Sequence, residues 1–187
     1  MGIVVTTQPS DEPITLAEAK IHLHVDHEDE DDLISKSIKV ARKYIEQIIN
    51  RPLITQSQTY YAECFDAEIS LKANLKSVAS INYIDANGVN QLLDPERYYV
   101  DTVADIGVVV PAYGSAWPSA RYERNSVKIE FVAGYGLADD VPEPIGQAIL
   151  LMVGDMFENR TESIIGVTVN KLNSVDSLLS TYRVLDH

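Results

Sequence analysis

The fold is decided by two neighbouring stretches, Phe131-Val-Ala-Gly-Tyr-Gly136 and, after a short acidic gap, Val141-Pro-Glu-Pro-Ile-Gly-Gln-Ala-Ile-Leu-Leu-Met-Val-Gly-Asp-Met-Phe-Glu-Asn-Arg160. The first predicts a strand that ends in a glycine turn. The second predicts a helix over residues 142–159, because proline suits the first helical turn, where its missing N–H has no partner within the helix. No polar residue occurs from 148 to 153, so this helix needs apolar partners on several sides. The stretch is suited to packing or assembly and carries no sign of chemistry.

The chain has 187 residues, a net charge of −13 and a single cysteine, Cys64. This length predicts one domain over residues 1–187. One cysteine excludes an internal disulfide framework and fits a reducing compartment. The acidic balance argues against a general nucleic-acid binder and against binding to anionic membranes, since both need clustered Lys and Arg. No apolar run is long enough for a transmembrane helix, so no membrane partner is expected.

The N-terminal part predicts two helices after an extended, irregular stretch over residues 1–13. Thr15-Leu-Ala-Glu18 is a capping box that opens a short helix ending at about residue 23. A second helix is predicted over residues 30–50, where apolar residues recur at steps of three and four. Polar residues occupy its other positions, and Pro52 ends it.

The middle of the chain changes to a period of two, which is typical of strands. Asn87-Gly88 marks a hairpin, because both turn positions tolerate a positive φ. The strand candidates cover residues 57–61, 69–73, 78–84, 98–100, 107–110 and 127–132. A last short helix is expected over residues 174–183, after a connection without helical period.

These segments together predict an α+β fold. We expect a small helical bundle, formed by the N- and C-terminal helices over residues 14–52 and 141–187. A β-rich insertion over residues 53–140 is expected to lie between them.

One region favours a metal site at first sight. Asp26-His-Glu-Asp-Glu-Asp-Asp32 concentrates carboxylates near three histidines, His22, His24 and His27. The calcium-loop pattern fails, because its sixth position is Asp31 where glycine is required, and its twelfth is Ser37 where glutamate is required. A solvated, acidic helix N-terminus explains the run without a metal, so no metal and no cofactor are predicted. No motif of a catalytic serine, a zinc protease or a phosphate loop occurs.

An ordered set of segments carries a resemblance to a known family. The N-terminal segments are Glu12-Pro-Ile-Thr-Leu-Ala-Glu-Ala-Lys20, His22-Leu-His-Val-Asp26, Asp31-Asp-Leu-Ile34 and Ala41-Arg-Lys-Tyr-Ile-Glu46. Further along come Ile81-Asn-Tyr-Ile-Asp85 with Asn87-Gly88, Tyr98-Tyr-Val-Asp101, Phe131 to Gly136, Val141-Pro, Ala148-Ile-Leu-Leu and Glu158-Asn-Arg160. In this order, over about residues 12 to 183, the chain resembles the head–tail connector, or head-completion adaptor, proteins of tailed phages.

The resemblance implies a virion structural protein that is not an enzyme. Members of this family form a homo-oligomeric ring between the portal protein and the tail, so the implied partners are further copies of the chain, the portal protein and a neck or tail-completion protein. The implied location is the head–tail junction of the virion, and the host cytoplasm during assembly. An acidic channel wall would let DNA pass without specific binding, because it makes no phosphate contacts.

If the chain assembles in this way, its functional residues are interface residues. We predict them on the polar face of the second helix, at Lys36, Lys39, Arg42 and Lys43, and in the segment Ile164-Ile-Gly-Val-Thr168, that is Ile164, Ile165, Gly166, Val167 and Thr168. Two alternatives stay open from sequence. One is an acidic metal-dependent enzyme that uses residues 26–32, and the other is a ligand-binding module that uses the tyrosine-rich β block.

Overall fold

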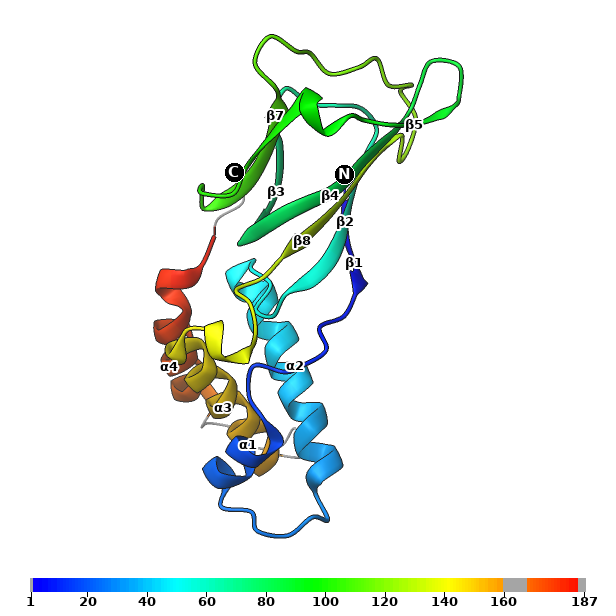
Figure 1. Cartoon of the computed structure of the whole chain (residues 1–187). Helices are drawn as coiled ribbons and strands as arrows, with labels where there is room; N and C mark the ends of the chain where they lie inside the picture. The colour runs from blue at the N-terminus through cyan, green and yellow to red at the C-terminus, as the bar shows by residue number, and fades with distance from the viewer. Residues whose placement is uncertain (1, 160–167, 185–187) are drawn as a thin grey trace. The chain divides into compact units, whose positions relative to one another are not determined.

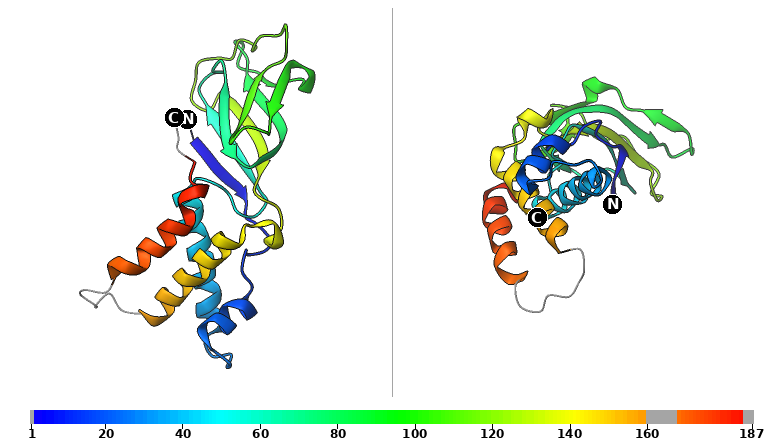
Figure 2. Two further views of the ribbon diagram at one scale, coloured as in Figure 1. Left: turned by 90° about the vertical axis from the view of Figure 1, so that its left-hand side faces the viewer. Right: turned by 90° about the horizontal axis from the view of Figure 1, so that it is seen from below.

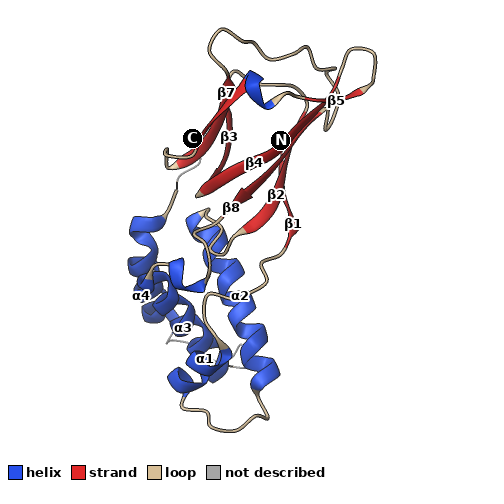
Figure 3. Ribbon diagram, viewed as in Figure 1, coloured by secondary structure: helices blue, strands red, loops and turns tan. Residues whose placement is uncertain are grey.

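The computed structural model describes residues 2–159 and 168–184, together with the side chains of these residues except those of 168–173. The chain divides into two compact units. The helical unit comprises Ser10–Ile54 and Tyr135–His187, and the β unit comprises Met1–Pro9 and Thr55–Gly134. Figure 1 shows the elements of each unit along the chain, and Figure 3 shows that helices dominate one unit and strands the other.

The predicted fold class, a helical bundle of N- and C-terminal helices with a β-rich insertion, is wrong. The described residues form four α-helices and two antiparallel sheets with eight strands. The first strand, β1 (Gly2–Thr7), precedes every helix and belongs to the β unit, so the strands are not an insertion. Residues 1–13 seemed irregular in sequence because β1 is an edge strand, and most of its side chains face solvent and lack an alternating pattern. Whether the two units unfold as one domain is not tested by this division, and the single domain stays a prediction.

The helical unit contains α1 (Leu16–Leu23), α2 (Asp31–Ile49), α3 (Glu143–Glu158) and α4 (Thr168–Leu179). In Figures 1 and 2, α3 lies beside both α2 and α4, and it packs against each of these helices. Aliphatic side chains from all four helices form the core, which includes Ala19, Ile34, Ile38, Ile45, Ile145, Ile149 and Leu179. The connection predicted before the last helix ends earlier than expected, because α4 already begins at Thr168.

The helix ends follow from local chemistry. Thr15 accepts a hydrogen bond from the Glu18 amide while the Glu18 carboxylate accepts one from the Thr15 amide, which confirms the predicted capping box. His24 and Asn50 close α1 and α2 in the left-handed conformation. In α2 the buried row runs from Ile34 to Ile49, while the apolar residues Leu33 and Tyr44 beside it are exposed.

The β unit contains two sheets. The larger has the strand order β1-β2-β8-β4-β5, with β2 (Gln56–Ala62), β8 (Val127–Ala133), β4 (Leu75–Ile84) and β5 (Asn90–Leu92). The smaller has the order β3-β7-β6, with β3 (Ile69–Ala73), β7 (Ile106–Pro111) and β6 (Tyr98–Asp101). The predicted hairpin at Asn87-Gly88 joins β4 to β5, with a positive φ at Gly88 but not at Asn87. All pairings within the two sheets are antiparallel.

The core of the β unit combines aliphatic and aromatic side chains. Phe131, Ile129 and Ile81 are fully buried in this core. At one end the rings of Phe65 and Trp117 stack with centroids 4.8 Å apart. Such ring pairs add stability beyond the area that they bury.

Candidate assembly surfaces

The outer face of α2 carries the lysines that the sequence predicted at an interface. Lys36, Lys39 and Lys43 are exposed and, at 3.6 residues per turn, they lie on the side of the helix that faces away from its buried row. Three apolar residues are exposed beside them: Leu33 at 40%, Val40 at 55% and Tyr44 at 42%. A row of basic side chains and a row of apolar side chains therefore run along the same open helix face. Mixed faces of this kind are typical of protein–protein contacts, where apolar area and matched charge act together.

Arg42, which the sequence placed on this polar face, is buried and only 3% exposed. Its Nε donates to Glu12 Oε2 at 2.7 Å and its Nη1 donates to Glu46 Oε2 at 2.9 Å. The other Glu46 oxygen accepts the backbone N–H of Leu53 at 2.9 Å. Through Glu12 these contacts connect Arg42 of α2 to the segment before α1, and through Glu46 they connect it to the turn after α2. Arg42 therefore stabilises the interior of the helical unit.

Burial also changes the pKa of the Glu46 carboxyl. Desolvation raises the pKa of its carboxyl above the ordinary value, although the Leu53 amide and the Arg42 guanidinium both act to lower it. A buried carboxylate with a raised pKa needs its cation and its amide donor to remain ionised. The three charged side chains therefore act as one cluster, and removing any of them leaves another exposed to this penalty.

A hollow of about 530 Å³ lies beside α2 within the helical unit. Its floor is apolar, from Ile14, Leu16 and Ile38, and its rim carries Asp11, Asp139 and Lys39. Leu137, which is exposed, lies at one side. The turn that bears Leu137 is fixed because Asp140 Oδ2 accepts the Leu137 amide at 2.8 Å. The hollow thus adds a depression beside the outer face of α2, to which Lys39 contributes.

The second predicted interface segment falls largely outside the described residues. Ile164, Ile165, Gly166 and Val167 are not described, and Thr168 is described only as the first residue of α4. The role of this segment in assembly stays a prediction.

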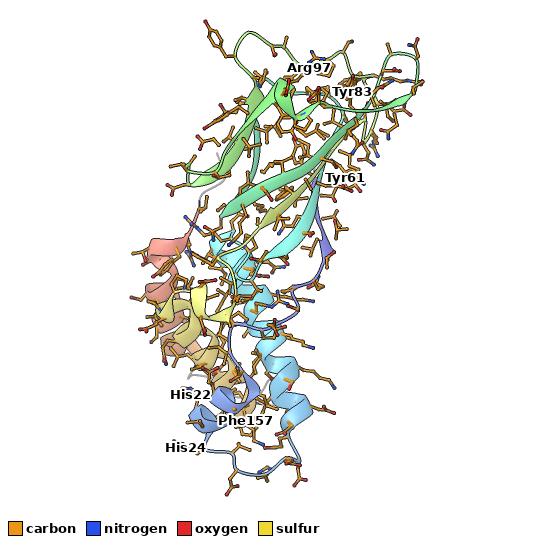
Figure 4. The ribbon with its side chains drawn as sticks, in the orientation of Figure 1. His22, His24, Tyr61, Tyr83, Arg97 and Phe157 are labelled. Carbon is orange, nitrogen blue, oxygen red and sulfur yellow. The ribbon has the colours of Figure 1, made fainter. Side chains whose placement is uncertain are left out.

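The acidic stretch over residues 26–32 is used locally. Lys20 Nζ forms an ion pair with Asp31 Oδ1 at 2.6 Å, and His27 Nδ1 lies 3.9 Å from Asp29 Oδ2. His22 lies near Gly154 of α3, and Figure 4 labels His22 and His24 on α1 and at its end. Across the described ranges no three His, Cys, Asp or Glu side chains are placed to hold a metal ion together. Nor does any described helix have the length and apolar character needed to cross a membrane.

The tyrosines of the β block differ in exposure. Tyr60 is buried, and burial raises the pKa of its hydroxyl. Tyr99, Tyr113 and Tyr122 are exposed and come from three segments: β6, the stretch after β7 and the stretch before β8.

Three comparisons with known proteins bear on this chain. Residues 13–91 match the family model described as phage gp6-like head–tail connector protein. No curated protein matches. The match covers α1, α2 and the strands from β2 to β4, and it includes the lysine row of α2.

Solved structures extend the likeness to the whole chain. A chain in the neck of an empty gene transfer agent (GTA) particle, computed with C6 symmetry, matches with a TM-score of 0.82 and 20% identity, over 100% of this chain and 97% of that one. A chain in the virion of a native GTA particle matches with a TM-score of 0.83 and 20% identity, over the same shares. A chain in the neck of a native GTA particle, computed with C12 symmetry, matches with a TM-score of 0.77 and 19% identity, again over 100% and 97%.

At this identity the solved structures establish a shared fold and nothing more. Over residues 13–91 the resemblance to head–tail connector proteins is confirmed by the match to the phage gp6-like family model, in agreement with the prediction of a structural connector subunit.

Proposed function

We propose that this protein is a virion connector subunit that assembles into a closed homo-oligomeric ring at the head–tail junction and catalyses no reaction. The family match over residues 13–91 carries this proposal. The full-length fold match to chains from particle necks, two of them computed with C6 and C12 symmetry, supports it. The match covers 100% of this chain and 97% of the matched chain, so the similarity extends over nearly the whole length of both.

The outer face of α2 forms one side of the contact between neighbouring copies in this proposal. A ring needs two different patches that meet head to tail. Lys36, Lys39 and Lys43 supply positive charge. The chain has 28 acidic and 15 basic residues, so the excess of acidic side chains can supply an acidic patch on the next copy that meets these lysines. Leu33, Val40 and Tyr44 supply the apolar area. The segment over residues 164–168 is proposed to contact the neighbouring copy or a different neck protein.

The remaining partners follow from the same position in a particle. The portal protein would lie on one side of the ring and a neck or tail-completion protein on the other. DNA would pass through the ring without specific binding, because a net charge of −13 repels phosphate unless lysines gather on the channel wall. The subunit would be made in the host cytoplasm before it enters the particle.

The first experiment is light scattering combined with negative-stain microscopy, on the purified chain and on the chain mixed with portal rings. Closed rings in either sample support the proposal. A chain that stays monomeric alone and also fails to bind portal rings would overturn it.

Charge reversal then tests the α2 face. The variant K36E/K39E/K43E is expected to lower ring formation at least about tenfold, because like charges at a contact oppose association. The single variants Lys39→Glu and Lys76→Glu are a matched pair, since each reverses one charge and Lys76 is an exposed lysine on β4. Equal effects of these two single variants would assign the loss to net charge and remove α2 from the interface.

A further inference from the structure

β1 is an edge strand without the usual protection. It pairs with β2 on one side, and no strand of the described chain pairs with its other side. Gly2-Ile-Val-Val-Thr-Thr7 contains no charge and no proline, and Val4 is 56% exposed. Natural sheets normally block a free edge with charged residues, proline or a very short strand, because unpaired N–H and C=O groups recruit another strand. β1 has a register irregularity only after Val5, so its first four residues form a regular open edge.

A hollow of about 540 Å³ lies next to this edge. It is lined by Gly2 and Val4 of β1, by Tyr61 and Ala62 at the end of β2, by Glu63 after β2, and by Arg124 and Asn125 before β8. Figure 4 labels Tyr61 close to β1. Tyr61 lies directly opposite Gly2 in the β1–β2 pairing, so the hollow opens on the sheet face that carries Gly2 and Val4. A strand added at β1 would place alternate side chains in this hollow, and such pockets give specificity to strand addition.

The chain itself offers a strand that matches this edge. Of its other edge strands, β5 has only three residues and β3 has an irregular register with β7. β6 has a free edge, and its sequence Tyr98-Tyr-Val-Asp101 is uncharged until its last residue. Tyr99 is 61% exposed and shares a face with Asp101, because side chains two apart on a strand point the same way.

We infer that the free edge of β1 in one copy pairs antiparallel with the free edge of β6 in the next copy. Tyr99 of the neighbour lies opposite Val4 and fills the hollow against Tyr61. Asp101 of the neighbour lies opposite Gly2, where its carboxylate meets Arg124. Glu63 lines the same hollow, but no ion pair of Arg124 occurs within the described part of the chain, so its guanidinium can accept the Asp101 carboxylate as a partner.

The same register joins the apolar faces of the two copies. Ile3 of β1 and Tyr98 and Val100 of β6 each pack against the β-unit core of their own copy. In this register Val100 lies opposite Ile3, so the two cores become continuous through the joined sheet. β1 and β6 are different strands, so the contact is head to tail and leads to a ring when the rotation closes. The inference rests on the proposed ring and names a contact that holds it together.

Cysteine cross-linking tests the register directly. In a Cys64→Ser background, the double variant V4C/Y99C places two thiols on opposite residues of antiparallel strands, at a Cα separation of about 4.5 to 5.5 Å that a disulfide spans. Oxidation is expected to give a ladder of covalent oligomers, which either single variant does not give. V4C/V89C is the matched control, because Val89 is similarly exposed beside the other edge of the same sheet.

Charge exchange tests the same contact without cysteines. Arg124→Asp is expected to raise the concentration needed for half-assembly about tenfold or more, and Asp101→Asn, which keeps an oxygen to cap the Val103 amide, is expected to raise it less. Val103→Lys, at a highly exposed position beyond β6, is the control and is expected to change nothing.

The outcomes separate this inference from the proposed function. A ladder supports the β1–β6 contact, whether or not closed rings are seen. Rings without a ladder, or a ladder only in the V4C/V89C control, would overturn the contact and leave the proposed function intact. A chain with neither rings nor a ladder, alone and on portal rings, would overturn both.

Discussion

The two units of this protein keep polar groups in their interiors in different ways. The helical unit has an aliphatic core and buries one arginine, which Glu12 and Glu46 neutralise. The β unit has a partly aromatic core and buries uncharged side chains of β2, among them Gln58, whose Oε1 has no partner within the described residues. The arginine of α2 can be buried because two neighbouring carboxylates supply its counter-charges, whereas the buried polar side chains of β2 are neutral and need only hydrogen bonds.

The largest expected effect comes from core truncation in each unit. Phe131→Ala in the β unit is expected to cost about 3 to 5 kcal/mol of unfolding free energy, and Ile45→Ala in the helical unit about 2 to 5 kcal/mol. Trp117, the single tryptophan, reports on the β unit by fluorescence, and helical circular dichroism reports on the helical unit. If the chain is one domain, either variant lowers both transitions together.

Separate transitions of the two units would contradict the single domain. If Ile45→Ala lowers the helical transition and leaves the Trp117 transition unchanged, the units unfold independently. The predicted single domain over residues 1–187 would then be wrong.

The second prediction concerns the buried charge that distinguishes the helical unit. Arg42→Ala is expected to cost about 3 kcal/mol, because it leaves the Glu46 carboxylate buried without its cation. Lys43→Ala, at the exposed neighbouring position, is expected to change stability by less than about 0.5 kcal/mol. Urea unfolding at neutral pH measures both.

The pH dependence of this variant follows from Glu46. Its pKa is already raised by burial, and loss of Arg42 removes a group that lowers it. A folded-state pKa above the unfolded value favours folding of the protonated form, so the deficit of Arg42→Ala is expected to shrink as pH falls. A deficit that stays constant as pH falls would mean that Glu46 is not the source of the penalty.

The comparison also shows which parts of the structure are readable from sequence. The capping box at Thr15, the period of α2 and the Asn87-Gly88 hairpin depend on residues close together in the chain, and all three were predicted correctly. β1 was missed because pairing with β2, more than fifty residues away, makes it a strand. Edge position removes the alternation that would reveal such a strand.

The candidate surfaces were readable only in part. Helical period placed Lys36, Lys39 and Lys43 correctly on the open face of α2. The same period could not show that Arg42, one position before Lys43, turns inward, because Glu12 reaches it from a distant segment. The hollow at Gly2, Tyr61 and Arg124 was missed for the same reason: three separate segments form it.

The third prediction concerns a glycine in the helical unit. Gly136 has φ of +154°, and a Cβ there would collide with the Asp140 carboxylate that holds the Leu137 amide. Gly136→Ala is expected to cost about 2 kcal/mol through backbone strain and displacement of Asp140. Gly114→Ala is the control in the β unit, because Gly114 also has a positive φ but open space around it. Thermal unfolding compares an alanine at φ +154° that collides with Asp140 with an alanine at φ +76° that meets open space, and the first is expected to cost more.

The smallest expected effect lies at the start of α1. Hydrogen bonds from the Thr15 hydroxyl and the Thr15 amide lower the pKa of the Glu18 carboxyl below its ordinary value of 4.5. A lowered folded-state pKa means that the capping box stabilises the protein above the ordinary pKa and loses this contribution as pH falls through the folded value. Thr15→Ala, which tests this cap, is expected to cost about 1 kcal/mol of unfolding free energy at neutral pH.

Below the folded-state pKa of Glu18 the cost of Thr15→Ala is expected to be smaller, because the hydrogen bonds that the ionised Glu18 carboxylate accepts are already lost. Ala17→Ser, at an exposed position of the same helix, controls for the general effect of pH on α1. An equal cost of Thr15→Ala at both pH values would show that Glu18 takes no part in the cap, and that the start of α1 depends on the threonine hydroxyl alone.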